Sequence, residues 1–211
     1  MRGLVDQNSK LFSILNKLTL LLELNLLVLL CCLPVITAGA ALSSMHGVLL
    51  KIYRDEEKRV IPDFFQAMKS NMKNGTILWL LFLGYMGLLA GGYAAVAAWA
   101  SDEATYVVFG LLLAAIIGII YLNWALILQS RYVYTIHECL KNALLAWMKY
   151  PGAVFVYLVA ALIPVLLCFS FWSMPLVLLI GVTLPQMLMS TPLYNRVFDE
   201  MEGVPTHLPK L

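Results

Sequence analysis

A long apolar stretch near the start of the chain, broken once, constrains the fold more than any other feature. Residues 11–33 form a run of about 23 mostly apolar residues, enough for a helix that crosses the ~30 Å hydrocarbon core of a bilayer. The run stops at Pro34, and Gly39 follows. Proline blocks continuation of a helix, and glycine allows the chain to reverse. Since residues 39–53 then predict a second helix, we interpret the whole stretch as a helical hairpin.

The composition of the chain is that of an integral membrane protein. Hydrophobic residues make up 62% and charged residues 12% of the sequence, whereas an average soluble domain has roughly 25% charged residues. Four further apolar segments lie at about 76–100, 106–128, 152–170 and 175–195. We therefore predict a single all-α polytopic membrane domain over residues 1–211. A cleaved signal peptide is the alternative for the first run, but Glu23 and Asn25 inside it argue against cleavage.

The distribution of lysine and arginine sets the expected orientation. All fourteen lie before the first span or in its first turns, in the connections near 51–73 and 131–149, or in the tail, and the connections at 101–105 and 171–174 contain none. Because basic residues stay on the cytoplasmic side, residues 11–53 must cross twice. We expect about six membrane segments in three hairpins, with both termini cytosolic in a bacterial cytoplasmic membrane. The arm at 39–53 reaches only ~21 Å, so this hairpin is either a short double crossing or re-entrant.

The two long basic connections each predict an amphipathic helix at the cytosolic surface. The first covers residues 61–74 and ends at Gly75; the second covers 135–149, opens with a Thr-x-x-Glu capping box and ends at Pro151. Their apolar faces carry Phe65 and Met68 in the first helix and Leu140, Leu144 and Trp147 in the second. Such helices either anchor the protein at the lipid headgroups or dock a partner.

Small residues recur every four positions in three of the predicted spans, one of them with Gly110, Ala114 and Gly118. Gly39, Ser43 and Gly47 form one such face, and Gly87 and Gly91 belong to another. Faces of this kind let two helix backbones approach closely in a membrane. They predict packing within the molecule, and a homodimer interface is the alternative.

Four polar side chains fall inside apolar runs: Glu23, Asn25, His46 and Asn123. Ionisable groups at membrane depth are functional candidates. We expect Glu23 to pair with Lys17 or His46, or to reach interfacial water, and the amides to hydrogen-bond between helices. A catalytic set is not recognisable, and neither a cofactor nor a metal site is predicted. The net charge of +2 gives no reason to expect a nucleic-acid partner.

Several short motifs resemble those of the YesL-type family of small bacterial membrane proteins. They are Asn25-Leu26-Leu27, the break at Leu33–Gly39, Asp63-Phe64-Phe65, Met68-Lys69 and the segment Leu140–Leu145. The family has no established function. Its members are often encoded beside carbohydrate ABC importers in Gram-positive bacteria, and the resemblance therefore implies an accessory role in sugar uptake, without any catalytic residue.

We therefore expect a non-enzymatic accessory membrane protein, embedded in the lipid bilayer and associated with subunits of a carbohydrate ABC importer, its assembly or its regulation. The alternative is a small transporter or channel whose polar path would include the four intramembrane polar residues. A membrane enzyme ranks third, because the sequence shows no polar cluster suited to catalysis.

Overall fold

All the regular secondary structure in the described part of the protein is helical. The computed structural model describes residues 2–56, 59–98, 104–150 and 181–202, with isolated positions between 152 and 175, and it describes side chains from Phe12 onward. Within these ranges no strand is present. Four helical segments there are long and apolar enough to cross a membrane. The protein is thus an all-α membrane protein, as its composition predicts.

The N-terminal hairpin consists of α1 (Arg2–Cys32) and α2 (Ala38–Tyr53), joined by the short 3-10 helix η1 (Val35–Thr37). The chain turns at the expected break. Pro34 is exposed and precedes η1, and the Thr37 hydroxyl donates a hydrogen bond to the Cys31 carbonyl at 2.7 Å. This bond satisfies one of the carbonyls that the end of α1 leaves without a helical partner. Pro34 therefore marks the turn between α1 and α2 and remains exposed there.

The next element, α3 (Val60–Ala97), is one continuous helix of 38 residues. This corrects the prediction of a surface helix at 61–74, a break at Gly75 and a separate span from residue 76. A glycine alone costs a helix only about 1 kcal/mol, and here it allows close packing. Gly75 lies against Gly39 of α2, and a Cβ atom on Gly39 would clash with the Gly75 carbonyl oxygen.

The buried face of α3 also differs from the predicted one. Phe64 is fully buried whereas Phe65 is 49% exposed, and Met68 is buried one turn further along. Two adjacent phenylalanines differ by about 100° around a helix, so either could have faced the core. The core between α1, α2 and this half of α3 selects Phe64, together with Val60 and Asn71.

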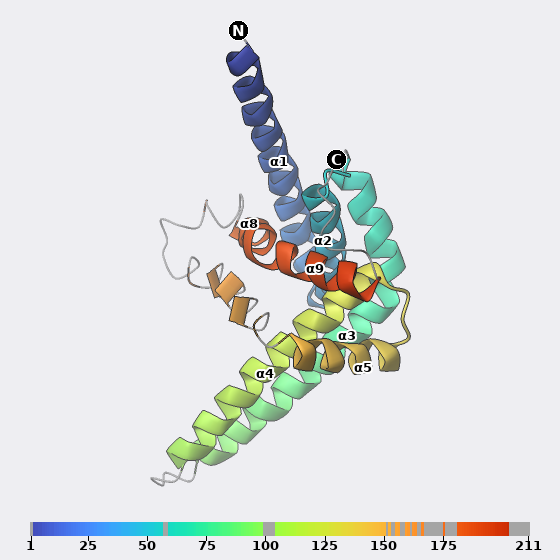
Figure 1. The fold of residues 1–211 in the computed structure, drawn as a ribbon. Coiled ribbons are helices and arrows are strands. Elements are labelled where there is room, and N and C mark those ends of the chain that lie inside the picture. Colours follow the sequence, from blue (N-terminus) through green and yellow to red (C-terminus); the bar gives the residue numbers. More distant parts are fainter. Residues whose placement is uncertain are drawn as a thin grey trace.

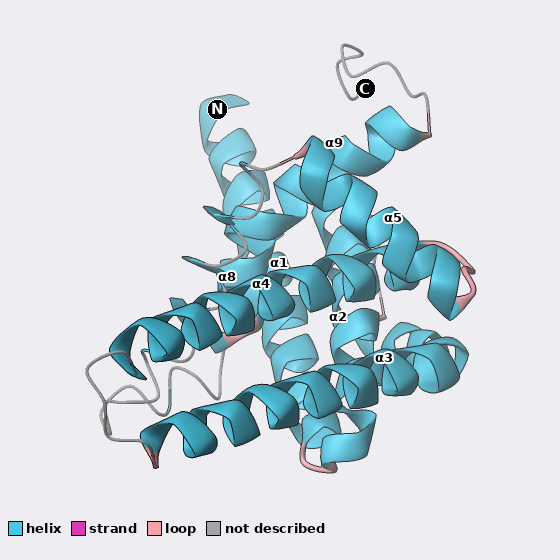
Figure 2. Cartoon of the chain, turned by 90° about the horizontal axis from the view of Figure 1, so that it is seen from below, coloured by secondary structure: helices cyan, strands magenta, loops and turns pink. Residues whose placement is uncertain are grey.

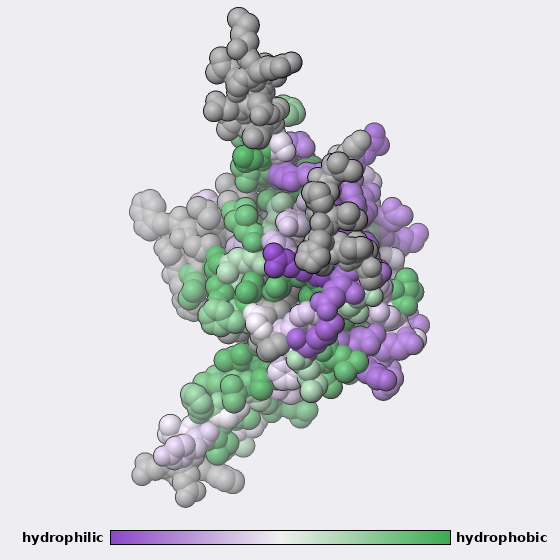
Figure 3. All heavy atoms as spheres, viewed as in Figure 1, coloured by the Kyte–Doolittle hydropathy of each residue, from purple (hydrophilic) through white to green (hydrophobic). Residues whose placement is uncertain are grey.

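The second half of α3 and α4 (Ala104–Arg131) run side by side as a long hairpin that projects from the rest of the molecule (Figures 1 and 2). Its surface is largely hydrophobic, whereas hydrophilic residues gather at the opposite end (Figure 3). After α4 comes α5 (Ile136–Lys149), which begins with the predicted capping box. The Thr135 hydroxyl accepts from the Glu138 N–H at 3.4 Å, and the Glu138 carboxylate accepts from the Thr135 N–H at 2.9 Å.

The C-terminal part is a helical run that crosses the ends of other helices. It contains α8 (Thr183–Pro185), the π-helical turn η4 (Gln186–Ser190) and α9 (Thr191–Met201). The sequence predicts a span at 175–195, but the helix continues to Met201 and its last part is amphipathic. Tyr194 and Phe198 are fully buried in a core shared with α4 and α5. The predicted span at 152–170 lies outside the described residues, apart from isolated positions.

Candidate functional site

The small-residue face of α2 sets the positions of the buried polar groups around it. Gly39 lies against Gly75 of α3, and the Ser43 hydroxyl donates to the Leu126 carbonyl of α4 at 3.0 Å. Gly47 follows one turn later, where a Cβ would lie 3.4 Å from the Ser130 carbonyl oxygen. These three residues of α2 therefore pack the helix inside the molecule.

A polar cluster, which we name the His46 cluster and whose members other than the partly buried Asn123 are buried, lies where α2, α4 and α9 meet. Its members are His46, Asn123, Gln186, Thr191 and Tyr194. His46 is 2% exposed, and its imidazole hydrogen-bonds the Asn123 side chain. The Tyr194 ring meets the imidazole edge-on at 6.0 Å. Its hydroxyl lies 2.9 Å from the Thr191 hydroxyl and 3.3 Å from the His46 carbonyl. Thr191 in turn donates to the Gln186 carbonyl at 3.1 Å.

The members of the His46 cluster can donate or accept hydrogen bonds, and none of them is a carboxylate. His46 Nδ1 has no hydrogen-bond partner in the described part of the molecule, and neither has the side-chain Oε1 of Gln186, whose main-chain carbonyl accepts from Thr191. Buried polar atoms are usually paired, and Gln186 opens a π-helical turn, a feature common at functional sites. In the part of the chain that the structure describes, no group of three His, Cys, Asp or Glu residues is placed to bind a metal ion.

The other two predicted polar residues lie elsewhere. Asn25 is fully buried, and its Oδ1 accepts from the N–H groups of Val182 (3.0 Å) and Thr183 (3.1 Å). These two bonds tie the C-terminal helical run to α1. Glu23 faces outward. Lys17, one of the partners considered for Glu23, forms an ion pair with Asp55 at 2.7 Å. Of the four candidates, only His46 and Asn123 meet.

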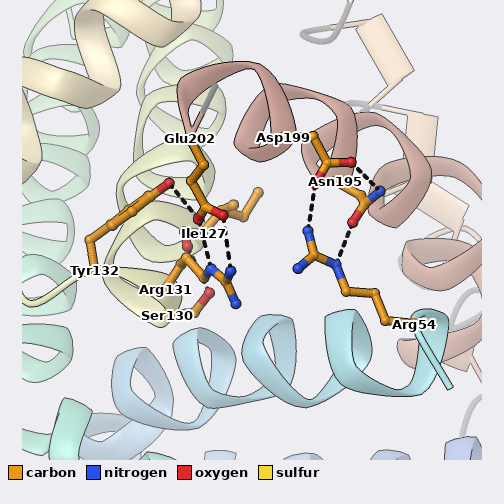
Figure 4. A network of polar contacts seen from close by, with 8 residues as sticks. All are labelled: Arg54, Ile127, Ser130, Arg131, Tyr132, Asn195, Asp199 and Glu202. Atoms are coloured by element: carbon orange, nitrogen blue, oxygen red, sulfur yellow. Dashed lines mark hydrogen bonds and ion pairs between the residues drawn. The ribbon is translucent and has the colours of Figure 1, made fainter. Parts of the chain in front are cut away.

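A second polar constellation, the charged latch, fixes α9 across the ends of three helices. Figure 4 shows the Arg54 guanidinium from the end of α2 donating to Asn195 at 2.7 Å and to Asp199 at 2.8 Å. Both acceptors lie on α9, and the Asn195 amide also donates to Asp199 at 3.2 Å. The arginine is only 17% exposed. Hydrogen bonds to such a charged group are stronger than neutral ones.

The latch continues at the ends of α4 and α5. Arg131 donates two parallel bonds to Glu202, at 3.1 and 3.2 Å, and the Tyr132 hydroxyl donates to the same carboxylate at 3.1 Å. The bonds from Arg131 hold the pKa of Glu202 below its ordinary value. Burial raises the pKa of Tyr132 to about 12, so its hydroxyl keeps its proton. Lys149 at the end of α5 pairs with Glu200 at 2.9 Å.

Sequence reasoning misses most of both constellations. Thr191 and Tyr194 fall within a predicted span and carry no motif, and the acids of the tail resemble an ordinary solvated segment. One signal is present: Tyr194, Val197 and Phe198 recur at helical spacing, and Asp199, Glu200 and Glu202 follow them immediately. An apolar stripe followed by acidic residues predicts an amphipathic helix whose acidic end pairs with basic residues elsewhere in the protein.

The predicted docking residues of α5 have mixed surroundings. Leu140 and Trp147 pack partly against the core, and Leu144 is 44% exposed. The buried positions of α5 are instead Cys139, Ala143 and Ala146. On α3, a Cβ atom added to Gly87 or Gly91 would have no described atom within 4 Å, so these glycines make no close contact with the rest of the described molecule.

The protein is therefore a helical membrane protein in which an N-terminal hairpin packs on a long second hairpin and a C-terminal amphipathic helix closes one end. Residues 21–93 match the family described as "Protein of unknown function, DUF624", to which YesL-type proteins belong, and the family resemblance is confirmed over this segment. The matched segment contains the end of α1, the turn, α2 and most of α3. Neither a curated protein nor a solved structure matched the chain.

Proposed function

We propose that the protein is a non-enzymatic accessory protein of the bacterial cytoplasmic membrane that binds another membrane protein through the outer face of α3. This proposal rests on the lack of close neighbours around Gly84, Gly87 and Gly91 in the described part of the molecule. These glycines lie in the projecting half of α3, and a Cβ on any of them would meet no described atom within 4 Å. Each costs the helix about 1 kcal/mol relative to alanine.

The three glycines share one side of the helix, turned away from α4. At about 100° per residue, Gly84 and Gly91 nearly superimpose, and Gly87 lies within a quarter turn of them. The α4 side of the same helix instead carries Leu78, Tyr85 and Gly92, and Gly92 lies near Leu111 of α4. A smooth glycine face favours close approach of a second helix in lipid. Contact with another transmembrane helix would offset the cost of the glycines, which packing within the described chain does not.

The partner class rests on the family resemblance, which implies a carbohydrate ABC importer, its assembly or its regulation. We further propose that the charged latch faces the cytosol, together with both termini. The ion pairs Lys17–Asp55, Arg54–Asp199 and Arg131–Glu202 bring basic residues from α1, α2 and α4 to the same end of the molecule. The positive-inside rule assigns such an end to the cytoplasmic side.

Co-purification tests the partner. The tagged protein would be cross-linked in native membranes, extracted in mild detergent, and examined for importer subunits by mass spectrometry. We expect Gly91→Ile to abolish recovery of the subunits. Ala97→Ile is the matched control, because Ala97 is exposed on the same helix but points about 120° away from Gly91 and about 80° away from Gly87. The proposal fails if importer subunits are absent from the wild-type sample, or if both variants recover them equally.

The orientation has a test of its own. In a cysteine-free background, a cysteine at Ser70 should resist an impermeant maleimide in intact cells, and one at Ser101 should react. Reaction at Ser70 from outside would reverse the proposed topology.

A small transporter is the second candidate, and the unpartnered atoms of the His46 cluster are the observation that favours it. A path for a polar substrate needs hydrogen-bonding groups at membrane depth. Reconstituted protein would be assayed for sugar uptake in proteoliposomes, comparing the wild type with His46→Ala and with Glu23→Gln as the outward-facing control. Uptake that is lost only in His46→Ala supports a transporter, and the absence of uptake by the wild type removes this candidate.

A further inference from the structure

We propose that a cleft between α3, α4 and α5 binds one acyl chain of a membrane phospholipid, with the lipid phosphate beside Lys141. The cleft has a volume of about 450 Å³. Its walls are Leu78 and Phe82 from α3, Ile117 and Leu122 from α4, and Leu144 and Trp147 from α5. This inference is independent of the proposed partner, because the glycine face of α3 lies on the other side of that helix.

The lining offers almost no hydrogen-bonding group to a ligand. Two tyrosines border the cleft, but both hydroxyls are already engaged. The Tyr85 hydroxyl donates to the Ala114 carbonyl at 2.8 Å, and the Tyr121 hydroxyl donates to the Leu140 carbonyl at 2.7 Å. The Tyr85 ring also lies directly on Gly118, where a Cβ would clash with it. The tyrosines therefore present ring carbons to the cleft. A sugar or another polar ligand would lose its water without gaining hydrogen bonds, so the occupant is an aliphatic chain.

The size and position of the cleft favour a lipid as the source of that chain. A water-sized group takes roughly 30 Å³, so the cleft holds about 15 methylene-sized groups, the length of one fatty acyl chain. The cleft lies between α5 and the α3–α4 hairpin, whose surface is largely hydrophobic (Figure 3), and α5 lies across this hairpin (Figure 1). An amphipathic helix that crosses a membrane hairpin marks the boundary between headgroups and acyl chains.

Lys141 supplies the complementary charge. It is exposed on α5 and lies one helical turn before Leu144, which lines the cleft. A lipid whose chain enters beside Leu144 would place its phosphate within reach of this ammonium group. The next turn of the same helix carries Leu145 and Met148, both exposed and apolar, so the helix also has a side suited to contact with neighbouring lipids.

Native mass spectrometry tests the cleft with phosphatidylglycerol as the probe. We expect detergent-purified wild-type protein to retain one tightly bound lipid, and Leu144→Trp to lose it because the indole fills the cleft. Leu145→Trp is the matched control, since it makes the same change at the adjacent exposed position outside the cleft. Circular dichroism checks that both variants fold. Equal retention by the two variants would overturn the proposal.

Fluorescence gives a second readout that does not depend on a blocking substitution. Phosphatidylglycerol with brominated acyl chains should quench Trp147 in a saturable manner, with the Trp147 signal obtained by difference from Trp147→Phe. Lys141→Gln should weaken this binding about fivefold, which corresponds to ~1 kcal/mol per lysine near a lipid headgroup, and Lys69→Gln should leave it unchanged. Quenching that rises linearly without saturation, or an affinity unchanged by Lys141→Gln, would refute the proposed site.

Discussion

The crossing of α2 and α3 gives the sharpest test of the helix packing. Gly39 and Gly75 bring two helix backbones into direct contact at this point. A Cβ added to Gly39 would clash with the Gly75 carbonyl oxygen and would lie 2.5 Å from Trp79 Cβ. Since both obstacles are attached rigidly to the backbone, no side-chain rotation relieves them. Gly39→Ala must therefore move the helices apart.

The expected free energies follow from two opposing effects. Overpacking in a tight interior costs about 1–3 kcal/mol, and a clash with backbone places Gly39→Ala at about 3 kcal/mol. Alanine recovers about 1 kcal/mol of helix propensity, which leaves a net loss of about 2 kcal/mol. At Gly91 a Cβ meets no described atom within 4 Å, so Gly91→Ala keeps only the gain of about 1 kcal/mol.

The two variants can be compared by titrating the purified protein from mild detergent into SDS and following helix content by circular dichroism. Gly39→Ala should shift the midpoint to lower SDS and raise the unfolding equilibrium constant about 30-fold, at tenfold per 1.4 kcal/mol. Gly91→Ala should shift the midpoint the other way. If both variants move in the same direction, the close crossing of α2 and α3 is not present.

Three further predictions use the same titration. Arg54→Ala should lower the free energy of unfolding by about 2 kcal/mol, because two hydrogen bonds to a charged group are lost. The control Lys69→Ala, at an exposed position, should leave it unchanged. Equal effects of the two variants would contradict the charged latch. Asn25→Leu should cost about 2 kcal/mol, because the buried N–H of Thr183 and the partly buried N–H of Val182 lose their acceptor. Glu23→Gln should be neutral, and a larger effect at Glu23 than at Asn25 would contradict this assignment. The folded state holds the pKa of Glu202 below its ordinary value of 4.5. The ionised carboxylate therefore adds to the free energy of unfolding above pH 4.5, and this stabilisation is lost as the pH falls through the folded-state pKa. Glu202→Gln should abolish this part of the pH dependence, and an unchanged acid profile would show that the carboxylate contributes nothing.

In the first half of α3, the local sequence predicts the helix but not which of its residues are buried. The pattern predicts a helix with an apolar side, and a helix is present. Phe64 and Phe65 are both apolar, however, and only the surface of α1 and α2 decides that Phe64 enters the core. Gly75 is a similar case. Its sequence neighbourhood is compatible with a helix end, and its contact with Gly39, far away in the chain, explains why a glycine occupies a continuous helix.

The candidate sites also contain some residues that the sequence identifies and others that only the tertiary structure brings together. His46 and Asn123 can be identified from the sequence because polar groups stand out in apolar runs. Tyr194 completes their cluster from the other end of the chain. Asn25 stands out for the same reason, but its role depends on Thr183, more than 150 residues later in the chain. A single sequence contains no local signal for such a distance.

The sequence by itself determined the membrane class, the hairpin turn after residue 33 and the start of α5, because apolar length, proline and a capping box act within a few residues of one another. Only the tertiary structure decided which faces are buried, that α3 is continuous, and that α9 closes one end through Arg54 and Asp199. These features depend on groups that meet only after the helices have packed. Their energies come from close contact and from charges brought together in space, which the order of residues along the chain does not specify.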